Sequence, residues 1–141
     1  SLHAPNDELR RTLIPWARRV PIAVLVEALR DYFDRTHREV TIEYILLGGV
    51  NDRLEHADQL ATLCRKMHCN VNLIRYNPIP GISFERPGSV AAHQFAERLR
   101  KRGVNVHIRK SRGLDINAAC GQLRRATIDR SPGAIQNTAE S

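Results

Sequence analysis

The chain has 141 residues, of which 42% are hydrophobic and 26% are charged, a balance that is typical of one soluble, globular domain rather than of a disordered protein. No apolar run approaches the length of a membrane span, and no signal peptide opens the sequence. The net charge is +7 and only three of the 22 basic residues are lysine, which fits both a nucleic-acid partner and an arginine-rich surface held in solvent.

The amino-terminal part predicts a short strand followed by two helices. Residues 1–4 read as an extended strand stub that Pro5 ends. Asn6 and the acidic residues after it predict a helix start, and Pro15 interrupts that helix. Pro21 opens the next helix, in which apolar residues recur at helical spacing: Ile22, Leu25, Val26, Leu29 and Phe33.

A buried strand and a further helix come next. Residues 40–47, VTIEYILL, are β-branched and almost continuously apolar, which predicts a strand buried on both faces. Gly48, Gly49 and the pair Asn51-Asp52 make the turn that follows it. The helix after this turn has one apolar face, formed by Leu54, Ala57, Leu60, Ala61, Cys64 and Met67.

The second half of the chain repeats the alternation of strand and helix. Residues 70–76 predict a strand, and residues 77–88 predict a loop stiffened by three prolines. A helix runs from Ser89 to Gly103, and residues 104–109 alternate apolar and polar side chains, which predicts a strand with one solvent-facing side.

The end of the chain predicts a short helix after Asp115 that finishes near Ala126. The final stretch has turn-forming and polar residues without periodicity, which predicts a disordered tail. We therefore expect one domain over residues 1–127 and a tail over residues 128–141.

Strands that alternate with helices at this spacing form parallel βαβ units, so the predicted fold class is α/β with mainly parallel strands. A doubly wound open sheet and a part of a β/α barrel both fit this order of elements. Both architectures place active residues in loops at the carboxyl ends of the strands.

Small polar groups, amides and cations stand at the expected strand ends, around one thiol. These residues are Ser1, His3, Gly48, Gly49, Asn51, Asn77, Arg109, Lys110, Ser111, Arg112 and Cys120. Cations beside a cysteine lower the pKa of its thiol, so Cys120 can serve as a nucleophile. The alternative is that Cys120 and the two alanines before it are small packing residues of a tight turn.

The chain holds three cysteines, an odd number without the spacing of a disulfide framework. This predicts reduced thiols in a cytoplasmic protein. Cys64, His68 and Cys69 lie close together but match no established metal-binding spacing. We expect Cys64 and Cys69 to be buried where a helix meets a strand.

Four motifs occur in order along the chain: SLHAPND, EYILLGGVND, NLIRYNPIPG and RKSRGLDINAACGQL. Each is a weak signal alone, but four in this order at compatible spacing form a strong one. Over roughly residues 1–128 the chain resembles the C-terminal half of the RlmN/Cfr-type radical S-adenosylmethionine (SAM) methyltransferases. Those enzymes methylate an adenine carbon in ribosomal RNA and, in the RlmN branch, in transfer RNA.

The resemblance implies a fold and a set of site residues. The family's fold is a partial (β/α)6 radical SAM barrel, so this chain would supply the later βα units, a C-terminal strand and a cysteine loop. The family's SLH segment and the asparagine of its NP turn contact SAM, and they match Ser1, Leu2, His3 and Asn77. The family's C-terminal cysteine becomes S-methylcysteine during turnover, and it matches Cys120.

The resemblance also implies a mechanism and partners. One SAM would methylate the Cys120 thiolate, and a reduced 4Fe-4S cluster would cleave a second SAM to a 5′-deoxyadenosyl radical. That radical would take a hydrogen atom from the methylated cysteine, the resulting carbon radical would add to C2 of the adenine, and a second cysteine would resolve the covalent adduct. The substrates would be 23S rRNA and tRNA, and an electron donor such as flavodoxin would reduce the cluster in the cytoplasm. The target base would be flipped out of its RNA fold, while Arg109, Lys110 and Arg112 hold RNA phosphates.

The family's cluster motif, C-x-x-x-C-x-x-C, and its resolving cysteine are absent here. We therefore expect no metal ligand in this chain and no activity from the chain alone. The first residue is Ser rather than Met, which predicts that part of the protein precedes it. Tyr76 stands where the family usually has Trp, a change that keeps an aromatic ring. An isolated half-barrel would leave the edge of the 40–47 strand open, which predicts self-association or marginal stability.

Three other readings remain beside a C2 methyltransferase of the RlmN branch. One is the C8-methylating branch of the same family, and another is a radical SAM enzyme of a different type that uses the same barrel half. The third is a basic α/β module that holds RNA without chemistry. Replacing Cys120 separates the third from an enzyme, because a binding module would tolerate the loss of the thiol.

Overall fold

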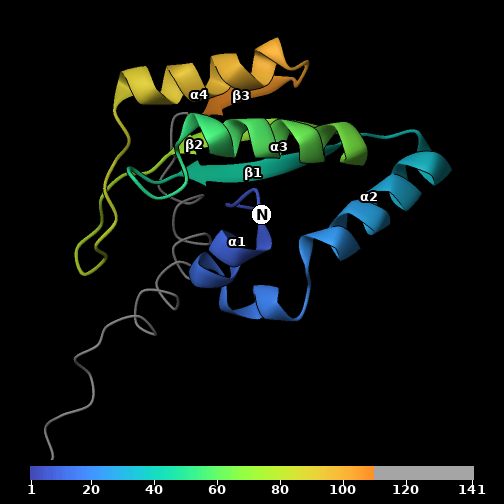
Figure 1. The fold of residues 1–141 in the computed structure, drawn as a ribbon, viewed down its shortest axis with the longest axis horizontal. Helices are drawn as coiled ribbons and strands as arrows, with labels where there is room; N and C mark the ends of the chain where they lie inside the picture. The colour runs from blue at the N-terminus through green and yellow to red at the C-terminus, as the bar shows by residue number, and fades with distance from the viewer. Residues whose placement is uncertain (110–141) are drawn as a thin grey trace, which may run out of the picture.

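The computed structural model describes residues 1–109, which form an α/β fold (Figure 1). The predicted alternation of strands and helices is confirmed from residue 22 onward. The strand expected over residues 1–4 is wrong, since this extended stretch forms no strand, and the helix expected after Asp115 and the expected tail lie outside the described residues. In chain order the elements are α1 (Asp7–Leu13), the 3-10 helix η1 (Pro15–Arg18), α2 (Ile22–Thr36), β1 (Val40–Leu46), α3 (Leu54–Met67), β2 (Cys69–Arg75), α4 (Ser89–Lys101) and β3 (Val106–Arg109).

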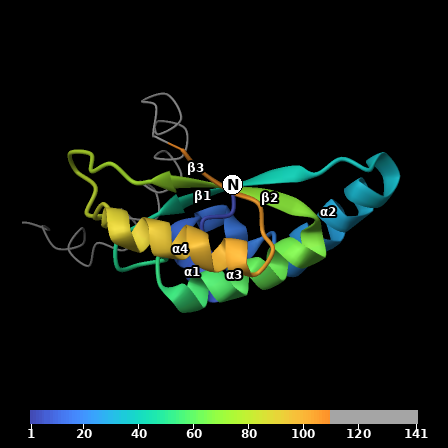
Figure 2. The ribbon, with the colours of Figure 1, turned by 90° about the horizontal axis from the view of Figure 1, so that it is seen from above.

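The three strands form one parallel sheet in the order β1-β2-β3. Residues 40–46 of β1 pair in register with residues 69–75 of β2, and residues 71–74 of β2 pair with β3. Helices α3 and α4 make the two crossovers and lie side by side along one face of the sheet (Figure 2). Because the strands are parallel, their carboxyl ends share one edge, where the turn after β1 meets the loop after β2.

The larger hydrophobic core lies between the sheet and helices α3 and α4. At its centre the rings of Tyr44 and Phe95 are tilted against each other with centroids 5.5 Å apart, and both side chains are fully buried. The apolar face predicted for α3 is confirmed for five residues: Ala57, Leu60, Ala61, Cys64 and Met67. The sixth prediction is wrong, because Leu54 opens the helix at the rim of the core and is 46% exposed.

A second, smaller core lies on the opposite face of the strands, because successive side chains of a strand alternate between faces. The prediction that residues 40–47 are buried on both faces is confirmed toward the carboxyl end only. Toward the amino end Thr41 is exposed and Glu43 is half-buried. The second core gathers Ala4, Leu13, Ile14, Ala17, Ile45, Leu47, Ile74 and Tyr76.

Two polar side chains of α1 form hydrogen bonds with the backbone of the segment that leads into α2. The Asp7 carboxylate accepts a hydrogen bond from the backbone N–H of Ile22 at 2.9 Å. Arg10 donates through Nη1 to the carbonyl of Val20 at 2.7 Å, and its guanidinium lies 5.1 Å from the centre of the Trp16 ring. Arg10 is fully buried, which the sequence did not predict, because charged side chains rarely lie inside a protein unless they are paired.

Helix α2 is the longest helix of the described chain and projects from the body of the molecule (Figure 1). Its apolar side is only partly buried, and Val24 and Tyr32 are exposed. A cavity of about 230 Å³ lies beside this helix, lined mostly by apolar side chains of α2 and of the amino end of β1. None of the helices in residues 1–109 combines the length and the apolar character needed to cross a membrane.

Strand β1 is one of the two edge strands of the described sheet, and its outer edge is partly covered. The strand stub expected over residues 1–4 contributes one backbone hydrogen bond, from the N–H of Leu2 to the carbonyl of Glu43 at 3.0 Å. The side chains of His3 and Asn51 cover the edge farther along. Thr41 precedes these bonds, next to the apolar cavity. An uncovered strand edge beside an apolar surface favours pairing between copies of a chain.

We expect the chain by itself to self-associate through this edge of β1. Thr41→Lys places a charge on the edge and should weaken association about tenfold or more. Sedimentation velocity over a range of protein concentrations measures the association. Thr62→Lys adds the same charge to the exposed side of α3 and should leave association unchanged. A chain that is monomeric at every concentration, or equal effects of the two substitutions, would contradict this expectation.

Candidate functional site

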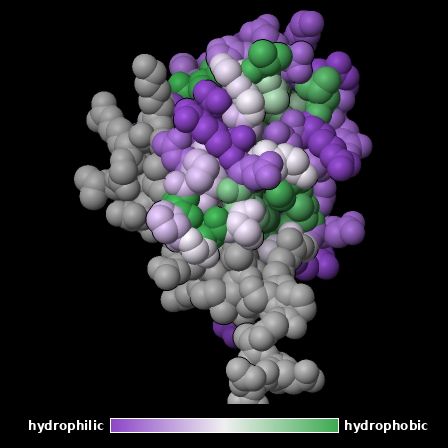
Figure 3. Space-filling view, turned by 90° about the vertical axis from the view of Figure 1, so that its left-hand side faces the viewer, coloured by the Kyte–Doolittle hydropathy of each residue, from purple (hydrophilic) through white to green (hydrophobic). Residues whose placement is uncertain are grey.

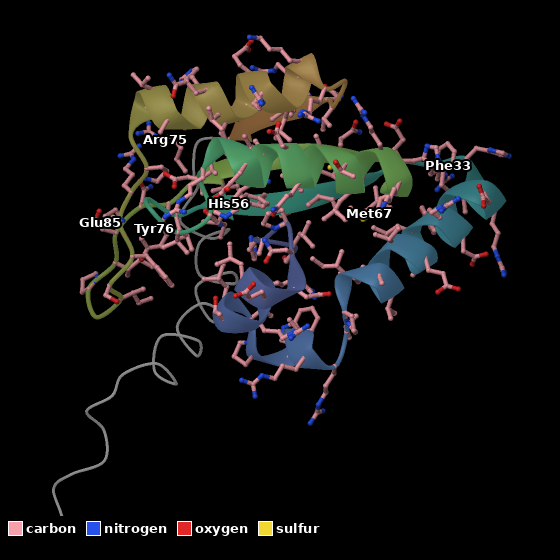
Figure 4. The ribbon with its side chains drawn as sticks, viewed as in Figure 1. Phe33, His56, Met67, Arg75, Tyr76 and Glu85 are labelled. Carbon is pink, nitrogen blue, oxygen red and sulfur yellow. The ribbon has the colours of Figure 1, made fainter. Side chains whose placement is uncertain are left out.

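The turn after β1 and the loop after β2 are joined at the carboxyl end of the sheet. Gly48 donates its N–H to the carbonyl of Glu85 at 2.8 Å, in an isolated antiparallel bridge. A Cβ atom at Gly48 would lie 3.2 Å from two carbonyl oxygens of that loop, so glycine permits this close approach. Glu85, Arg75 and Tyr76 gather at this end of the molecule (Figure 4).

Asn51 is the centre of a hydrogen-bond network at this end. Its side chain is fully buried, and Nδ2 donates to the carbonyl of His3 at 2.9 Å and to that of Ile45 at 2.7 Å. Oδ1 accepts from the N–H of Leu47 at 2.7 Å. The backbone carbonyl of Asn51 accepts from the Tyr44 hydroxyl at 2.8 Å. The amide therefore uses both of its hydrogens and its oxygen, as a buried polar group requires.

His3 lies beside Asn51 in a backbone conformation that few residues adopt. Its φ is 59°, in the left-handed region, which costs a non-glycine residue about 1 kcal/mol or more. The ring Nδ1 accepts a hydrogen bond from the N–H of Ile45 at 3.0 Å. Because Nδ1 is an acceptor, the proton of the neutral ring is on Nε2. His3 is 1% exposed, and Nε2 has no hydrogen-bond partner among the described residues.

Together the two side chains replace strand pairing along the outer edge of β1. In a parallel sheet, alternate residues direct both their N–H and their C=O toward the same neighbour. The N–H of Ile45 bonds the His3 ring and its C=O bonds the Asn51 amide, while the N–H of Leu47 also bonds Asn51. The chain leaves this edge at Pro5, so side chains rather than backbone satisfy the end of the strand.

The environment of His3 fixes its charge as well as its position. Burial, with smaller contributions from the positive charges of the amino terminus and Arg10, lowers the pKa of His3 from 6.5 to about 3. His3 is therefore neutral near pH 7, and its pKa is too low for general acid catalysis there. A neutral imidazole with one free N–H is a hydrogen-bond donor available to a ligand.

Asn77 lies at the same edge, directly after β2. Tyr76 donates its N–H to the carbonyl of Leu46 at 3.2 Å, which extends the pairing with β1 to the start of the loop. The Tyr76 ring is buried and meets Phe84 edge-on, with centroids 6.1 Å apart. These contacts hold the residue before Asn77 and leave Asn77 itself half-buried. The structure thus brings His3 and Asn77 to the edge that the sequence predicted.

The other two residues predicted to contact SAM, Ser1 and Leu2, come before His3 in the chain and lie beside β1. Leu2 is buried and contributes its backbone N–H to the bond with Glu43. Ser1 is exposed and, like Leu2, lines the cavity beside α2. The backbone of both residues is therefore held near the strand, but their side chains face a different region from the carboxyl edge.

A short row of polar side chains crosses the sheet, and the sequence analysis did not single it out. Glu43 Oε1 accepts a hydrogen bond from Asn72 Nδ2 at 3.1 Å, and the two residues are register partners on β1 and β2. Arg109 Nη1 lies 3.8 Å from the same carboxylate oxygen. One sequence signal could have revealed this row: Glu43 is the only acidic residue in the apolar run VTIEYILL. Because side chains alternate along a strand, Glu43 lies on the face of the sheet opposite α3 and α4.

The predicted RNA-binding and catalytic residues lie at and beyond the end of the described chain. Arg109 ends β3 and is the last described residue, with its cation against Glu43. Three of the predicted site residues lie outside residues 1–109: Lys110, Arg112 and Cys120.

The two described thiols are part of the core, as predicted. Cys64 and Cys69 are 3% and 8% exposed, and the Cys69 thiol points to the carbonyl of Cys64 at 4.0 Å. The neighbouring Cys69 thiol and burial both raise the pKa of the Cys64 thiol, so Cys64 stays protonated. Among residues 1–109, no three His, Cys, Asp or Glu side chains are placed to hold a metal ion.

Figure 3 shows the molecule from the side on which the strands end. Hydrophilic residues cover much of this face, and hydrophobic patches interrupt them. A surface that combines apolar area with a few placed polar groups is typical of ligand sites. The carboxyl edge of the sheet is therefore the candidate functional site.

The burial of His3 predicts a loss of stability in acid. Between pH 6.5 and about 3 the unfolded chain binds a proton at His3 that the folded chain does not, so the free energy of unfolding falls as the pH falls through this window. From pH 7.5 to 5.5 we expect a loss of about 1.4 kcal/mol from this residue. Urea unfolding at the two pH values measures it.

His3→Asn keeps an acceptor atom at the δ position and tolerates the left-handed backbone, but it does not titrate. This variant should lose most of the pH dependence. The matched control is His37→Asn, because His37 has a similar φ of 55° but is exposed, and it should leave the pH dependence unchanged. An equal loss of stability in the wild type and in His3→Asn would contradict the neutral, buried state of His3.

Comparisons with known proteins agree with this arrangement of strands and loops. No family model matches the chain. A solved structure described as a radical SAM methyltransferase from Sphaerobacter thermophilus superposes with a TM-score of 0.78. The match has 51% sequence identity and covers 87% of this chain and 36% of that chain. The three parallel strands and their helices therefore form part of a radical SAM methyltransferase fold.

Sequence relatives lead to the same family. A protein of Prochlorococcus marinus described as "Probable dual-specificity RNA methyltransferase RlmN" is 56% identical over 124 residues, which are 88% of this chain and 36% of the relative. A protein of Thermosynechococcus vestitus with the same description is 49% identical over 128 residues, 91% of this chain and 38% of the relative. The chain spans about a third of the length of the curated relatives it matches. Over that third, the chain belongs to the RlmN family of radical SAM RNA methyltransferases.

Proposed function

We propose that this chain is the C-terminal part of an enzyme that methylates C2 of an adenine in 23S rRNA and in tRNA. The observation that carries the proposal is an identity of about half over nine-tenths of the chain to proteins described as RlmN. The match covers only 36% of the relative, so we assign the complete reaction to a full-length protein rather than to this chain by itself.

The carboxyl edge of the sheet fits SAM on chemical grounds. His3 is buried and carries an Nε2–H without a partner among the described residues, a costly arrangement unless a ligand accepts that hydrogen bond. In the proposed site, His3 and Asn77 hold SAM from the ends of β1 and β2, and the backbone of Ser1 and Leu2 lies alongside. Bound SAM would supply the methyl group and the precursor of the radical.

We assign Cys120 the role of methyl carrier, on the match of its ACGQL motif to the family. The Cys120 thiol first loses its proton, and the resulting thiolate accepts a methyl group from SAM. The S-methyl group is then presented to the adenine. Small neighbours on both sides, two alanines and a glycine, let the backbone approach the base closely. Cys64 and Cys69 are unsuited to this role because they are buried between α3 and the sheet.

The residues of this chain do not fit a 4Fe-4S cluster. Within residues 1–109 no group of metal-binding side chains is assembled, and the cysteines of the whole sequence lack the cluster spacing. We therefore assign the cluster, and its reduction by a donor such as flavodoxin, to the part of the enzyme that the relatives carry outside the matched third. The proposed enzyme works in the cytoplasm, where RNA substrates and reduced thiols are found.

The positive charge of the chain supports an RNA substrate. The net charge is +7, and arginine binds phosphate through a planar pair of donors. We place the phosphate contacts on the basic segment Arg109, Lys110 and Arg112 because it precedes Cys120 in the sequence. Arg109 would exchange its ion pair with Glu43 for a phosphate, or contact both, since the pair is 3.8 Å long and partly exposed.

The first test is mass spectrometry of the full-length protein isolated from growing cells. The tryptic peptide of residues 113–124 should carry one added methyl group on Cys120, and Cys120→Ala should abolish methyl transfer to RNA. Cys69→Ala removes another thiol of the chain and should leave transfer intact.

An unmodified Cys120, in protein supplied with iron and SAM, would contradict the proposed mechanism. Activity that survives Cys120→Ala would do the same. In either case a basic α/β module that binds RNA without chemistry becomes the better description.

RNA binding by the full-length protein should weaken steeply with salt, because phosphate contacts release counterions. Lys110→Ala combined with Arg112→Ala should lower the affinity about tenfold and reduce the slope of log affinity against log salt. Arg35→Ala combined with Arg38→Ala removes the same charge from the exposed end of α2 and the residues just after it, and is the control. Equal effects of the two pairs would show that net charge alone, and no particular segment, binds the RNA.

A further inference from the structure

The strongest polar anchor of the carboxyl edge, Asn51, is not among the residues that the family motif assigns to SAM. It is 0% exposed, and its amide makes three hydrogen bonds of 2.7–2.9 Å. Two of them link it to β1, at Ile45 and Leu47, and the third links it to the carbonyl of His3. Asn51 therefore joins two parts of the chain that are 48 residues apart.

The bond to the His3 carbonyl is one of the restraints on the position of the His3 ring. The backbone of His3 is held in the left-handed region, with φ at 59°, and the ring is held by the N–H of Ile45. Asn51 binds the carbonyl of that same Ile45, so one peptide segment of β1 positions both ends of His3. If the Asn51 amide were absent, the carbonyls of His3 and Ile45 would lose their donor and the left-handed turn would lose one of its restraints.

The ring held in this way offers one group to a ligand. Nδ1 is occupied as an acceptor, and Nε2–H is buried without a partner among the described residues. A donor fixed in position binds an acceptor with little loss of conformational entropy. A neutral donor also adds no positive charge next to the sulfonium of SAM, which a protonated histidine would repel.

We propose that Asn51 is a positioning residue for SAM, which holds His3 so that its Nε2–H donates to an acceptor atom of the ligand. This inference rests on the proposed function of the carboxyl edge as a SAM site. Asn51 itself does not touch the ligand in this account. It acts through His3, and removing it misplaces the donor.

The test is equilibrium binding of S-adenosylhomocysteine, which has no methyl group to transfer, to the full-length protein. Asn51→Ala and His3→Asn should each weaken binding about tenfold or more. The affinity of the double variant should equal that of whichever single variant has the lower affinity. This non-additivity is the signature of Asn51 acting through His3. Losses that add in the double variant would overturn the proposal, since Asn51 would then act on the fold independently of His3.

Asp52→Ala is the matched control for damage to the turn. The Asp52 carboxylate accepts a hydrogen bond from the N–H of Gly49 at 3.0 Å, in the same turn, and does not bond His3. It should leave ligand affinity within about twofold of the wild type. An equal loss in Asp52→Ala and Asn51→Ala would assign the effect to the turn as a whole and overturn the proposal.

A measurement on the unaltered protein covers the case in which Asn51→Ala does not fold. In protein labelled with 15N-histidine, the His3 ring should show a protonated Nε2 and an unprotonated Nδ1, with His3→Asn identifying the signals. Adding S-adenosylhomocysteine should shift the Nε2–H resonance and leave Nδ1 unprotonated. An unshifted Nε2–H signal at saturating ligand would overturn the proposal. Absence of any ligand binding by the wild type would instead overturn the proposed function.

Discussion

The side chains of Asn51 and His3 close the carboxyl end of β1, and the rest of the structure depends on this closure. A strand buried in the core must satisfy its backbone groups on both edges. On one edge β2 does so, but on the other the chain turns away at Pro5 before the strand has ended. The ring of His3 and the amide of Asn51 then take the place of a neighbouring strand at Ile45 and Leu47. The same bonds tie the beginning of the chain to the turn after β1, between the larger core with α3 and α4 and the smaller core with α1 and η1.

This closure links stability to chemistry, because the group that completes the strand is also the group offered to a ligand. On one side the His3 ring accepts a hydrogen bond from a backbone N–H, and on the other its Nε2–H is buried without a partner among the described residues. Burial keeps it neutral, so it serves recognition rather than proton transfer. The thiol assigned to the reaction, Cys120, lies outside the described residues, whereas the buried Cys64 and Cys69 belong to the packing of the sheet. Recognition and reaction are thus assigned to different segments, as is usual where strand ends and loops share one edge.

Most of the fold was predictable from the sequence because its signals are local. Hydrophobic spacing located the helices, the prolines at positions 15 and 21 located the breaks between them, and strands that alternate with helices predicted the parallel sheet. The position of Leu54 was predicted wrongly because the spacing of apolar residues does not show that the first residue of a helix extends beyond the core. The burial of Arg10 was missed because its partners, the Trp16 ring in η1 and the carbonyl of Val20 just after it, are brought together by a fold that spacing does not predict. The site was predictable as an edge of the sheet and, through the motifs, as a set of residues. The role of Asn51 was not, because its partners are backbone atoms, one of them 48 residues away, and a side chain bound to backbone leaves no pattern in the sequence.

The most direct test of this account is a crystal structure of the full-length protein with S-adenosylhomocysteine bound. The account predicts that the ligand lies at the carboxyl edge of the sheet, with an acceptor atom within hydrogen-bonding distance of His3 Nε2. It also predicts that the bonds from Ile45 to His3 and from Asn51 to the His3 carbonyl are unchanged. A ligand bound elsewhere, or one bound at this edge while His3 Nε2 pairs with another protein group, would contradict it.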